Sequence, residues 1–95
     1  GVASAAKKAA REANEGVIAQ AILPGARVGV LAEVNCETDF VAKNDSFRAF
    51  CDEVAKTLAA NPAADLEATR VAQVAKIGEN IRVRRFVRYQ LGEEM

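Results

Sequence analysis

Apolar and polar residues alternate over residues 28–34, which is the clearest strand pattern in the chain. Such alternation predicts a half-buried β-strand, because successive side chains of a strand point to opposite faces. A shorter apolar run covers residues 17–23, and Pro24 and Gly25 follow it as a typical turn dipeptide. We therefore expect the two runs to pair as an antiparallel hairpin.

The two faces of this predicted hairpin differ. One face of the second strand carries Val28, Val30, Ala32 and Val34. We assign that face to the core, since every position on it is apolar. Ile18 and Leu31 lie on the other face, and these large aliphatic side chains indicate that it is also partly covered.

Helical spacing replaces the strand pattern after residue 44. Apolar residues then recur every three or four positions, at Phe47, Phe50, Cys51, Val54 and Leu58. This stripe predicts an amphipathic helix. Asp45 or Ser46 is a suitable N-terminal cap, because a short side-chain oxygen can accept from the free amides of the first turn. Asn61 and Pro62 end the helix, because the residue before proline avoids helical geometry.

Two further helices are predicted, one after and one before this central helix. Residues 65–76 form the first, with Asp65 at its start and Gly78 as its C-terminal stop. Its apolar residues are Leu66, Val71, Val74, Ala75 and Ile77. Residues 3–14 form the second, an alanine-rich segment that Asn14 and Gly16 end.

Residues 80–90 return to a strand pattern. Ile81, Val83, Phe86, Val87 and Tyr89 are interleaved with Arg82, Arg84, Arg85 and Arg88. The alternation slips between Arg85 and Phe86, which a β-bulge explains. Together the elements predict an α+β fold, a small three-stranded antiparallel sheet with about three helices packed on it. At 95 residues the chain is long enough for one core, and we expect residues 1–95 to form a single domain.

Composition and charge narrow the function classes. The 13 basic and 13 acidic residues cancel, which removes a whole-chain attraction to nucleic acid or to an anionic membrane surface. No apolar run approaches the roughly 18 residues that span a bilayer, and the N-terminus lacks the apolar core of a signal peptide. We therefore expect a soluble domain without membrane contact.

The residues that carry most catalytic and metal chemistry are scarce. There is no histidine, the commonest general base near neutral pH and the commonest metal ligand. Cys36 and Cys51 are too few for a zinc site. A disulfide between them can be drawn, but nothing else points to a disulfide-stapled domain, so we expect two reduced and mostly buried thiols. We predict no metal site and no catalytic thiol.

The polar stretch 37–44, Glu-Thr-Asp-Phe-Val-Ala-Lys-Asn, lies between the second strand and the central helix. Its largest apolar side chain is Phe40, for which two interpretations exist. The ring can fold inward beside Phe47, or it can be presented to a partner. Asp39 fits a turn or cap position. The residues by themselves leave this choice open.

Three stretches of the chain resemble the translation elongation factor Ts family. Residues 30–44, Val-Leu-Ala-Glu-Val-Asn-Cys-Glu-Thr-Asp-Phe-Val-Ala-Lys-Asn, are similar to its signature. Residues 76–81, Lys-Ile-Gly-Glu-Asn-Ile, together with 83–86, Val-Arg-Arg-Phe, are similar to a second family block. The alanine-rich segment that leads into Glu15, Gly16 and Val17 resembles the approach to the first strand. The resemblance covers nearly the whole chain.

The chain covers only part of the architecture that is usual in this family. It resembles a compact version of the N-terminal core subdomain, either excised or encoded as a module of a larger protein. The N-terminal helical domain that grips the GTPase, the coiled-coil protrusion and the second core subdomain have no counterpart in it. The connection over residues 58–74 is also shorter than is usual.

The resemblance implies a guanine-nucleotide exchange factor module that binds the GTPase elongation factor Tu. In the family, an Asp-Phe pair of the signature loop is inserted near the nucleotide and magnesium site and promotes GDP release. That pair corresponds to Asp39 and Phe40, which favours an exposed Phe40. The implied partner-binding residues are Thr38, Asp39, Phe40, Val41, Lys43 and Asn44. GDP and Mg²⁺ belong to the partner, so the resemblance implies no cofactor and no small-molecule ligand of this chain, and no enzyme activity in the bond-making sense.

The arginine-rich strand is open to several interpretations. Four arginines in seven residues can follow RNA phosphates, contact a protein, or form a solvated and ion-paired face. Alternation sends them to different faces and the net charge is zero, which favours the solvated face. Arg84 and Arg85 are candidates for a secondary contact with the partner.

An alternative function is a translation-associated structural module of a plastid polyprotein, with ribosome or RNA contacts and little exchange activity. The resemblance implies the bacterial cytoplasm or the plastid stroma as the compartment, in preference to the mitochondrial matrix. In either compartment the protein would act in translation elongation.

Overall fold

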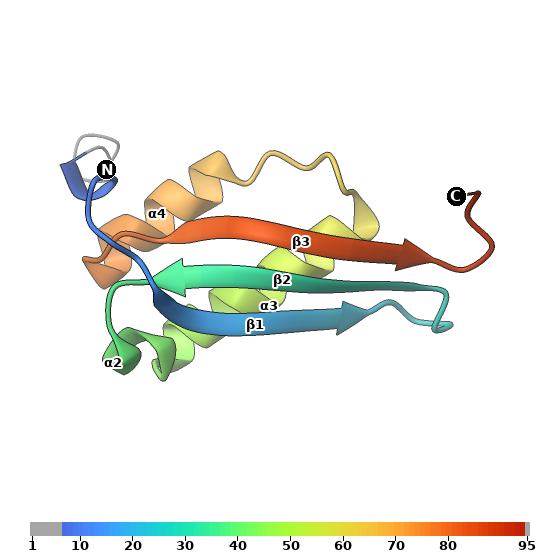
Figure 1. The fold of residues 1–95 in the computed structure, drawn as a ribbon, viewed down its shortest axis with the longest axis horizontal. Helices are drawn as coiled ribbons and strands as arrows, with labels where there is room; N and C mark the ends of the chain where they lie inside the picture. Colours follow the sequence, from blue (N-terminus) through green and yellow to red (C-terminus); the bar gives the residue numbers. More distant parts are fainter. Residues whose placement is uncertain (1–6, 95) are drawn as a thin grey trace.

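The structure, a computed structural model, describes residues 7–94. In chain order the elements are β1 (Glu15–Ile22), β2 (Val28–Cys36), α2 (Asp39–Ala42), α3 (Asp45–Ala60), α4 (Glu67–Ile77) and β3 (Arg82–Gln90). The strands form one antiparallel sheet in the order β1-β2-β3 (Figure 1). The predicted α+β fold, with three strands and three helices, is therefore confirmed for the described residues.

β1 and β2 form the predicted hairpin. They pair antiparallel along the whole length of β1, and a hydrogen bond of 2.9 Å from Leu23 N to Val28 O closes the turn. Near the start of β1, Gly16 lies so close to β2 that a Cβ there would be 2.1 Å from Val34 O. The hairpin therefore requires glycine at this position.

The core lies between the sheet and α3, which crosses behind the sheet in the view of Figure 1. The apolar stripe predicted for α3 is buried along its length: Phe47, Phe50, Cys51, Val54 and Leu58. It belongs to the same buried cluster as Val30, Ala32 and Val34 of β2, with Val28 half-buried at its edge. Both the helical stripe and the inward face of the second strand are confirmed.

Asn44 is the N-terminal cap of α3, where the sequence predicts Asp45 or Ser46. Asn44 Oδ1 accepts a hydrogen bond of 3.0 Å from Phe47 N, and Asp45 is the first helical residue. The prediction is wrong by one residue, because an amide oxygen caps a helix as well as a carboxylate or a hydroxyl does. At the other end, the helix stops before Asn61 as predicted.

β3 pairs with β2 and contains a bulge. Glu33 lies opposite Arg85 and the next pair joins Val34 to Val83, so Arg84 is the extra residue. The sequence predicts the bulge correctly in kind but one residue too late in position. With the extra residue at Arg84, Val83 packs against the core while Arg85 meets Glu33 at 2.7 Å.

α4 begins two residues later than the sequence predicts. Asp65 precedes the helix, where its Oδ1 accepts from Glu67 N at 2.9 Å. Gly78 ends the helix in the left-handed conformation, with φ of 85°, as predicted. Among the predicted apolar residues of this helix, Val74 is buried but Ala75 is exposed. α4 therefore contributes less to the core than α3 does.

The helix predicted for residues 3–14 is wrong over its second half. Residues 3–6 lie outside the described residues, Lys7 and Lys8 are helical, and residues 9–14 are turn and irregular chain. Asn80 Nδ2 donates to Arg11 O at 2.8 Å, and Ala13 is buried. These tertiary contacts outweigh helix propensity, because a short alanine-rich helix is marginal by itself.

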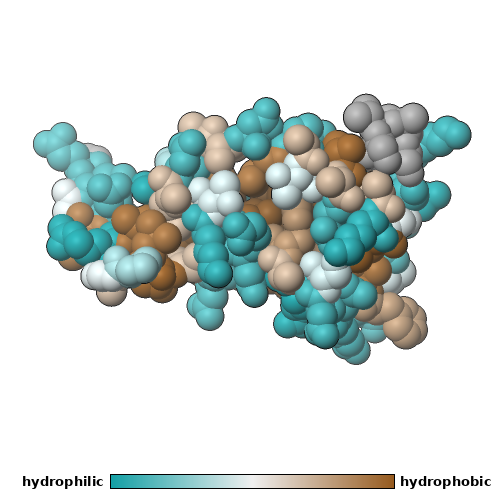
Figure 2. All heavy atoms as spheres, turned by 180° about the vertical axis from the view of Figure 1, so that it is seen from behind, coloured by the Kyte–Doolittle hydropathy of each residue, from teal (hydrophilic) through white to brown (hydrophobic). Residues whose placement is uncertain are grey.

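Within residues 7–94, no helix covers the face of the sheet opposite α3, and Figure 1 looks onto this open face. Ile18 is 63% exposed there and Leu31 is 49% exposed. The prediction that this face is partly covered is therefore wrong for the described residues. Figure 2 shows the helix side, where hydrophilic residues surround smaller apolar areas. The described part of the chain has no helix with the length and apolar character to cross a membrane.

Candidate functional site

Phe40 is presented at the surface on the short helix α2. Its side chain is 83% exposed, whereas Phe47, the neighbour against which it could have folded, is fully buried. α2 lies at the end of the sheet where β2 stops and β1 begins (Figure 1). Of the two interpretations of Phe40, the structure agrees with the one in which the ring is exposed rather than folded inward beside Phe47.

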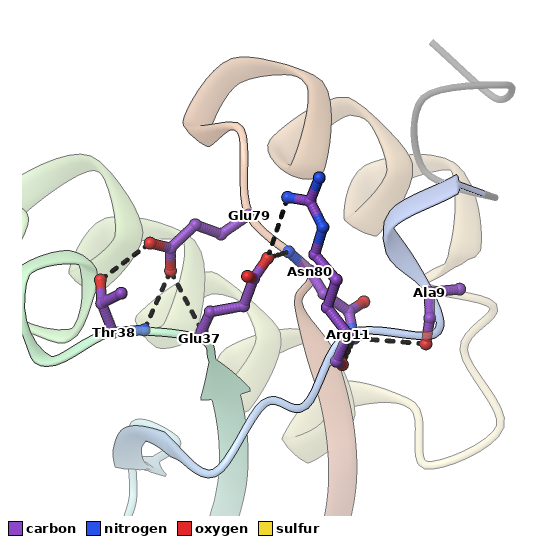
Figure 3. A network of polar contacts seen from close by, with 6 residues as sticks. All are labelled: Ala9, Arg11, Glu37, Thr38, Glu79 and Asn80. Atoms are coloured by element: carbon purple, nitrogen blue, oxygen red, sulfur yellow. Dashed lines mark hydrogen bonds and ion pairs between the residues drawn. The ribbon is translucent and has the colours of Figure 1, made fainter.

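Thr38 and Glu79 join the start of α2 to the loop before β3 (Figure 3). Thr38 is the N-terminal cap of α2, and its Oγ1 accepts from Val41 N at 3.3 Å. The same hydroxyl donates to Glu79 Oε2 at 2.8 Å. Glu79 Oε1 accepts from Glu37 N at 3.0 Å and from Thr38 N at 3.1 Å. One carboxylate therefore binds three donors from the chain that enters α2.

Glu37 makes the reverse connection. Its Oε2 accepts from Asn80 N at 2.6 Å and lies 3.6 Å from Arg11 Nη1. Asn80 is buried and its side-chain amide donates to Arg11 O at 2.8 Å and to Ala9 O at 3.5 Å. The loop after β2 and the loop before β3 thus each supply a carboxylate that accepts from backbone amides of the other loop. The N-terminal segment is bound to the same network (Figure 3).

The C-terminal end of α2 is held by α3. Arg48 Nε donates to Ala42 O at 2.7 Å, which satisfies a carbonyl that the short helix leaves without an internal partner. Ala42 is buried and Val41 is half-buried. Asp39 and Lys43 are exposed, and their 3.9 Å ion pair contributes little to stability in solvent.

The predicted partner-binding residues therefore occupy different kinds of position. Asp39, Phe40 and Lys43 have exposed side chains that a partner can contact directly. The side chains of Thr38 and Asn44 accept helix-capping hydrogen bonds, although Asn44 is also exposed, and Val41 is half-buried. Arg84 and Arg85 lie on β3, where Arg85 is bound to Glu33 rather than to α2.

The thiols are buried and free, as the sequence predicts. Burial raises the pKa of Cys36 to about 11 and the pKa of Cys51 to about 12. Cys36 Sγ donates to Thr38 O at 3.2 Å, which adds a contact beneath α2. Both thiols are protonated at neutral pH and are unsuited to nucleophilic chemistry. Residues 7–94 contain no group of three or more Cys, Asp or Glu placed to hold a metal ion.

The arginines of β3 do not form one surface. Arg85 Nε donates to Glu33 Oε1 at 2.7 Å on the open face of the sheet. Hydrogen bonds from Asn35 and then from Arg85 lower the pKa of the Glu33 carboxyl. Arg88 Nε donates to Ala59 O at 3.0 Å, on the side of α3. Arg84 is exposed at the bulge.

Sequence reasoning missed the roles of Glu37, Glu79 and Arg48. A usable signal was present for the two glutamates, since Glu37 lies three residues after the end of the second predicted strand and Glu79 directly precedes the third. In an antiparallel pair, the end of one strand lies beside the start of the next. The contact of Arg48 with Ala42 O has no comparable signal, because it depends on the angle between α2 and α3.

Comparisons with known proteins agree with the resemblance seen in the sequence. A sequence model of the family "Elongation factor TS" matches residues 37–95. Elongation factor Ts of Symbiobacterium thermophilum is 51% identical over 100 residues, which cover 98% of this chain and 33% of that protein. Elongation factor Ts of Burkholderia mallei and that of Burkholderia thailandensis are each 45% identical over 104 residues, which cover 96% of this chain and 35% of theirs. The chain spans about a third of the length of these curated relatives.

Proposed function

The chain belongs to the elongation factor Ts family, and from that premise we propose that it binds elongation factor Tu and promotes the release of GDP. The observation that carries the proposal is Phe40, which is 83% exposed on a helix held at both ends. A large aromatic ring that the fold holds in water is available for a partner to bury, and aromatic residues are enriched among those that dominate interfaces.

The proposed mechanism acts on the backbone that holds GDP. In GTPases, GDP is held through Mg²⁺ and through backbone amides around its phosphates. Inserting Phe40 and Asp39 beside that region displaces those groups and weakens GDP binding without competition for the nucleotide site. By linkage, the chain binds the nucleotide-free GTPase more tightly by the same factor by which it weakens GDP. No covalent bond is made or broken.

The proposed interface consists of the residues of the 38–44 segment. Asp39, Phe40 and Lys43 contact the partner directly, because their side chains are exposed. Thr38, Val41 and Asn44 remain in the proposed interface and also fix its shape through their capping and packing. Arg84 and Arg85 are proposed as a secondary contact only, since they lie on β3 rather than on α2.

The size of the interface sets the expected affinity. Burying a phenylalanine side chain is worth about 1.5–3 kcal/mol. A standard protein interface buries about 1,600 Å² in total, and a four-residue helix presents much less than its half of that. We therefore expect the chain to act at higher concentrations than a factor with a complete interface.

A titration of nucleotide release tests the proposal. Elongation factor Tu loaded with fluorescent GDP is mixed with excess unlabelled GDP and increasing concentrations of the chain. The release rate is expected to rise with the concentration of the chain and to reach a plateau. A folded chain that gives no acceleration at the highest concentration would contradict the proposed function.

The alternative of a plastid structural module with ribosome or RNA contacts stays a prediction. The three relatives described above are bacterial proteins. The distribution of the β3 arginines over different contacts gives this alternative no support of its own.

A further inference from the structure

The direction of Phe40 is set at the ends of α2, because the helix cannot set it by itself. α2 has four residues, far fewer than an isolated helix needs to persist in water. The Phe40 side chain contributes little packing, since it is 83% exposed, and Ala42 is the one fully buried residue among the four. Val41 is half-buried and packs with Ala42 against the core, so the orientation of the helix depends on this packing and on the contacts that fix its two termini.

Glu79 fixes the N-terminus of α2 through its hydrogen bond with the Thr38 hydroxyl. A hydroxyl has one proton to donate and two lone pairs that accept. Because Thr38 donates its proton to Glu79 Oε2 at 2.8 Å, a lone pair is left facing Val41 N at 3.3 Å. The carboxylate thus selects the hydroxyl orientation in which Thr38 caps α2. Its second oxygen binds the amides of Glu37 and Thr38, which fixes the backbone entering the helix.

Glu79 is itself held in place, unlike a free surface glutamate. It lies between Gly78, which ends α4, and Asn80, which is 1% exposed. The amide of Asn80 donates to Glu37 Oε2 at 2.6 Å, so each loop supplies the acceptor for the other loop's backbone (Figure 3). Charge-assisted bonds of this kind are stronger than neutral ones, and their reciprocity ties the two loops into one unit.

We propose that Glu79 is a positioning residue for nucleotide exchange, which holds α2 so that Phe40 points at the partner. The inference rests on the proposed function, since it assigns Glu79 to the step in which Phe40 is inserted. In enzymes, misplacement of a reacting group by about 1 Å can lower a rate by about a hundredfold, and we expect insertion of Phe40 to depend on position in the same way. Removing the carboxylate should therefore lower the exchange rate although Glu79 does not itself need to touch the partner.

The first experiment measures the chain without any partner. Amide hydrogen exchange is followed by NMR in the natural chain and in Glu79→Ala, Glu79→Gln and Glu93→Ala. In Glu79→Ala the amides of Thr38 and Val41 are expected to exchange at least about tenfold faster, because charge-assisted acceptors are lost. The amides of Ala55 and Leu58 in α3 are expected to be unchanged. The proposal is overturned if the amides of Ala55 and Leu58 exchange faster by the same factor as those of Thr38 and Val41. It is also overturned if exchange at Thr38 and Val41 is not accelerated.

The two other variants serve as controls. In Glu79→Gln, the amide oxygen can still accept from the two backbone amides, so most of the protection at Thr38 should remain. Glu93→Ala removes a carboxylate beyond the end of β3, and it should leave α2 unchanged. A loss of protection in Glu93→Ala equal to that in Glu79→Ala would show that the effect is not specific to the network, and would overturn the proposal.

The second experiment measures GDP release from elongation factor Tu over a concentration series of each variant. A merely unstable variant loses active chain, so adding more of it restores the plateau rate. A mispositioned Phe40 lowers the plateau itself, and we expect a fall of roughly tenfold or more for Glu79→Ala. Glu79→Gln should recover part of it, because its amide oxygen still accepts from the two backbone amides while its NH2 group cannot accept from the Thr38 hydroxyl. An unchanged plateau in Glu79→Ala, with the α2 amides loosened, overturns the proposal.

The two experiments separate this inference from the function on which it rests. If the natural chain does not accelerate release, the proposed function is wrong, and the exchange role of Glu79 falls with it. The amide measurement then still decides whether Glu79 holds α2. If the natural chain accelerates release, the plateau of Glu79→Ala decides the inference by itself.

Discussion

The hydroxyl of Thr38 lies 2.8 Å from Glu79 Oε2, although the two residues are 41 positions apart in the sequence. The bond connects the end of β2 to the start of β3 at the point where α2 begins. Because Thr38 caps α2, a contact between two loops becomes a constraint on the helix that carries Phe40. The end of the sheet therefore holds in place the helix that carries the exposed ring of Phe40.

Arg48 completes this arrangement from the other side. Its bond to Ala42 O joins the last residue of α2 to α3, which among the described elements supplies the largest share of the buried core. An exposed ring on a mobile loop would lose conformational entropy on binding, at a cost of about 1–2 kcal/mol for each backbone residue that is ordered. A ring on a helix fixed at both ends avoids much of that cost, which suits insertion into a partner.

Phe40→Ala is expected to abolish most of the acceleration of GDP release. Burial of the ring is worth about 1.5–3 kcal/mol, which corresponds to a roughly 10- to 100-fold loss. The free energy of unfolding should change by less than about 0.5 kcal/mol, because the side chain is 83% exposed. The measurements are the release titration and urea unfolding followed by circular dichroism.

Tyr89→Ala is the matched control for that substitution. Tyr89 is another exposed aromatic residue, 74% exposed near the end of β3, in a different element from α2. Its removal should leave the release rate unchanged. Equal losses in the two variants would show that exposed aromatic area in general, rather than Phe40, is responsible.

The parts of the fold that could be predicted are those with a local pattern. The alternation over residues 28–34 and the stripe from Phe47 to Leu58 are each contained in one element, and both are correct. The helix over residues 9–14 fails because alanine favours helix but buries little, so the bonds from Asn80 to the backbone decide its conformation. Local propensity cannot register a contact with a residue that is 69 positions away.

In the candidate site, too, features with a local sequence pattern could be predicted and features that depend on tertiary contacts could not. The exposed Phe40 was expected from the resemblance to a family, while the residues by themselves left its direction open. The contacts that hold α2 depend on the register of β2 and β3 and on the angle between α2 and α3. Neither of these is contained in a single stretch of sequence. Glu79 and Arg48 are consequently visible only in the folded chain.

Gly16→Ala is expected to destabilise the chain by at least about 3 kcal/mol, from backbone strain and overpacking together. Gly16 has φ of 139°, and an added Cβ would lie 2.1 Å from Val34 O, an atom that cannot move without disturbing the sheet. Gly25→Ala is the matched control, since its φ is 94° but nothing lies within 4 Å of an added Cβ. It should cost only about 1–2 kcal/mol. Urea unfolding of both variants measures the difference, and equal losses would contradict the role of the close approach.

RNA binding by the β3 arginines is expected to be weak. Each phosphate neutralised adds about one unit to the slope of log affinity against log salt, so a four-arginine surface would lose affinity steeply. Because Arg85 and Arg88 are engaged with Glu33 and Ala59, we expect less than about a tenfold change between roughly 50 and 200 mM salt. Fluorescence anisotropy with labelled RNA measures this. A steep slope that Arg84→Ala reduces would favour the RNA alternative.

Stability is expected to fall as the pH rises above about 9, because the folded chain holds the thiol protons of Cys36 and Cys51. Burial raises their pKa values from 9.0 to about 11 and about 12. Between these values the unfolded chain has released protons that the folded chain retains, so the free energy of unfolding decreases with pH. The loss at pH 10 is about 1.4 kcal/mol for each thiol. It is measured by urea unfolding at pH 8 and pH 10 in the presence of a reducing agent.

Cys51→Ala isolates the thiol contribution in that experiment. The substitution leaves a small cavity, which lowers stability at both pH values by a similar amount. The drop between pH 8 and pH 10 should nevertheless be smaller than in the natural chain by the share of one thiol, about 1.4 kcal/mol. An equal drop in both proteins would mean that other groups account for the alkaline loss and that burial of Cys51 does not raise its pKa.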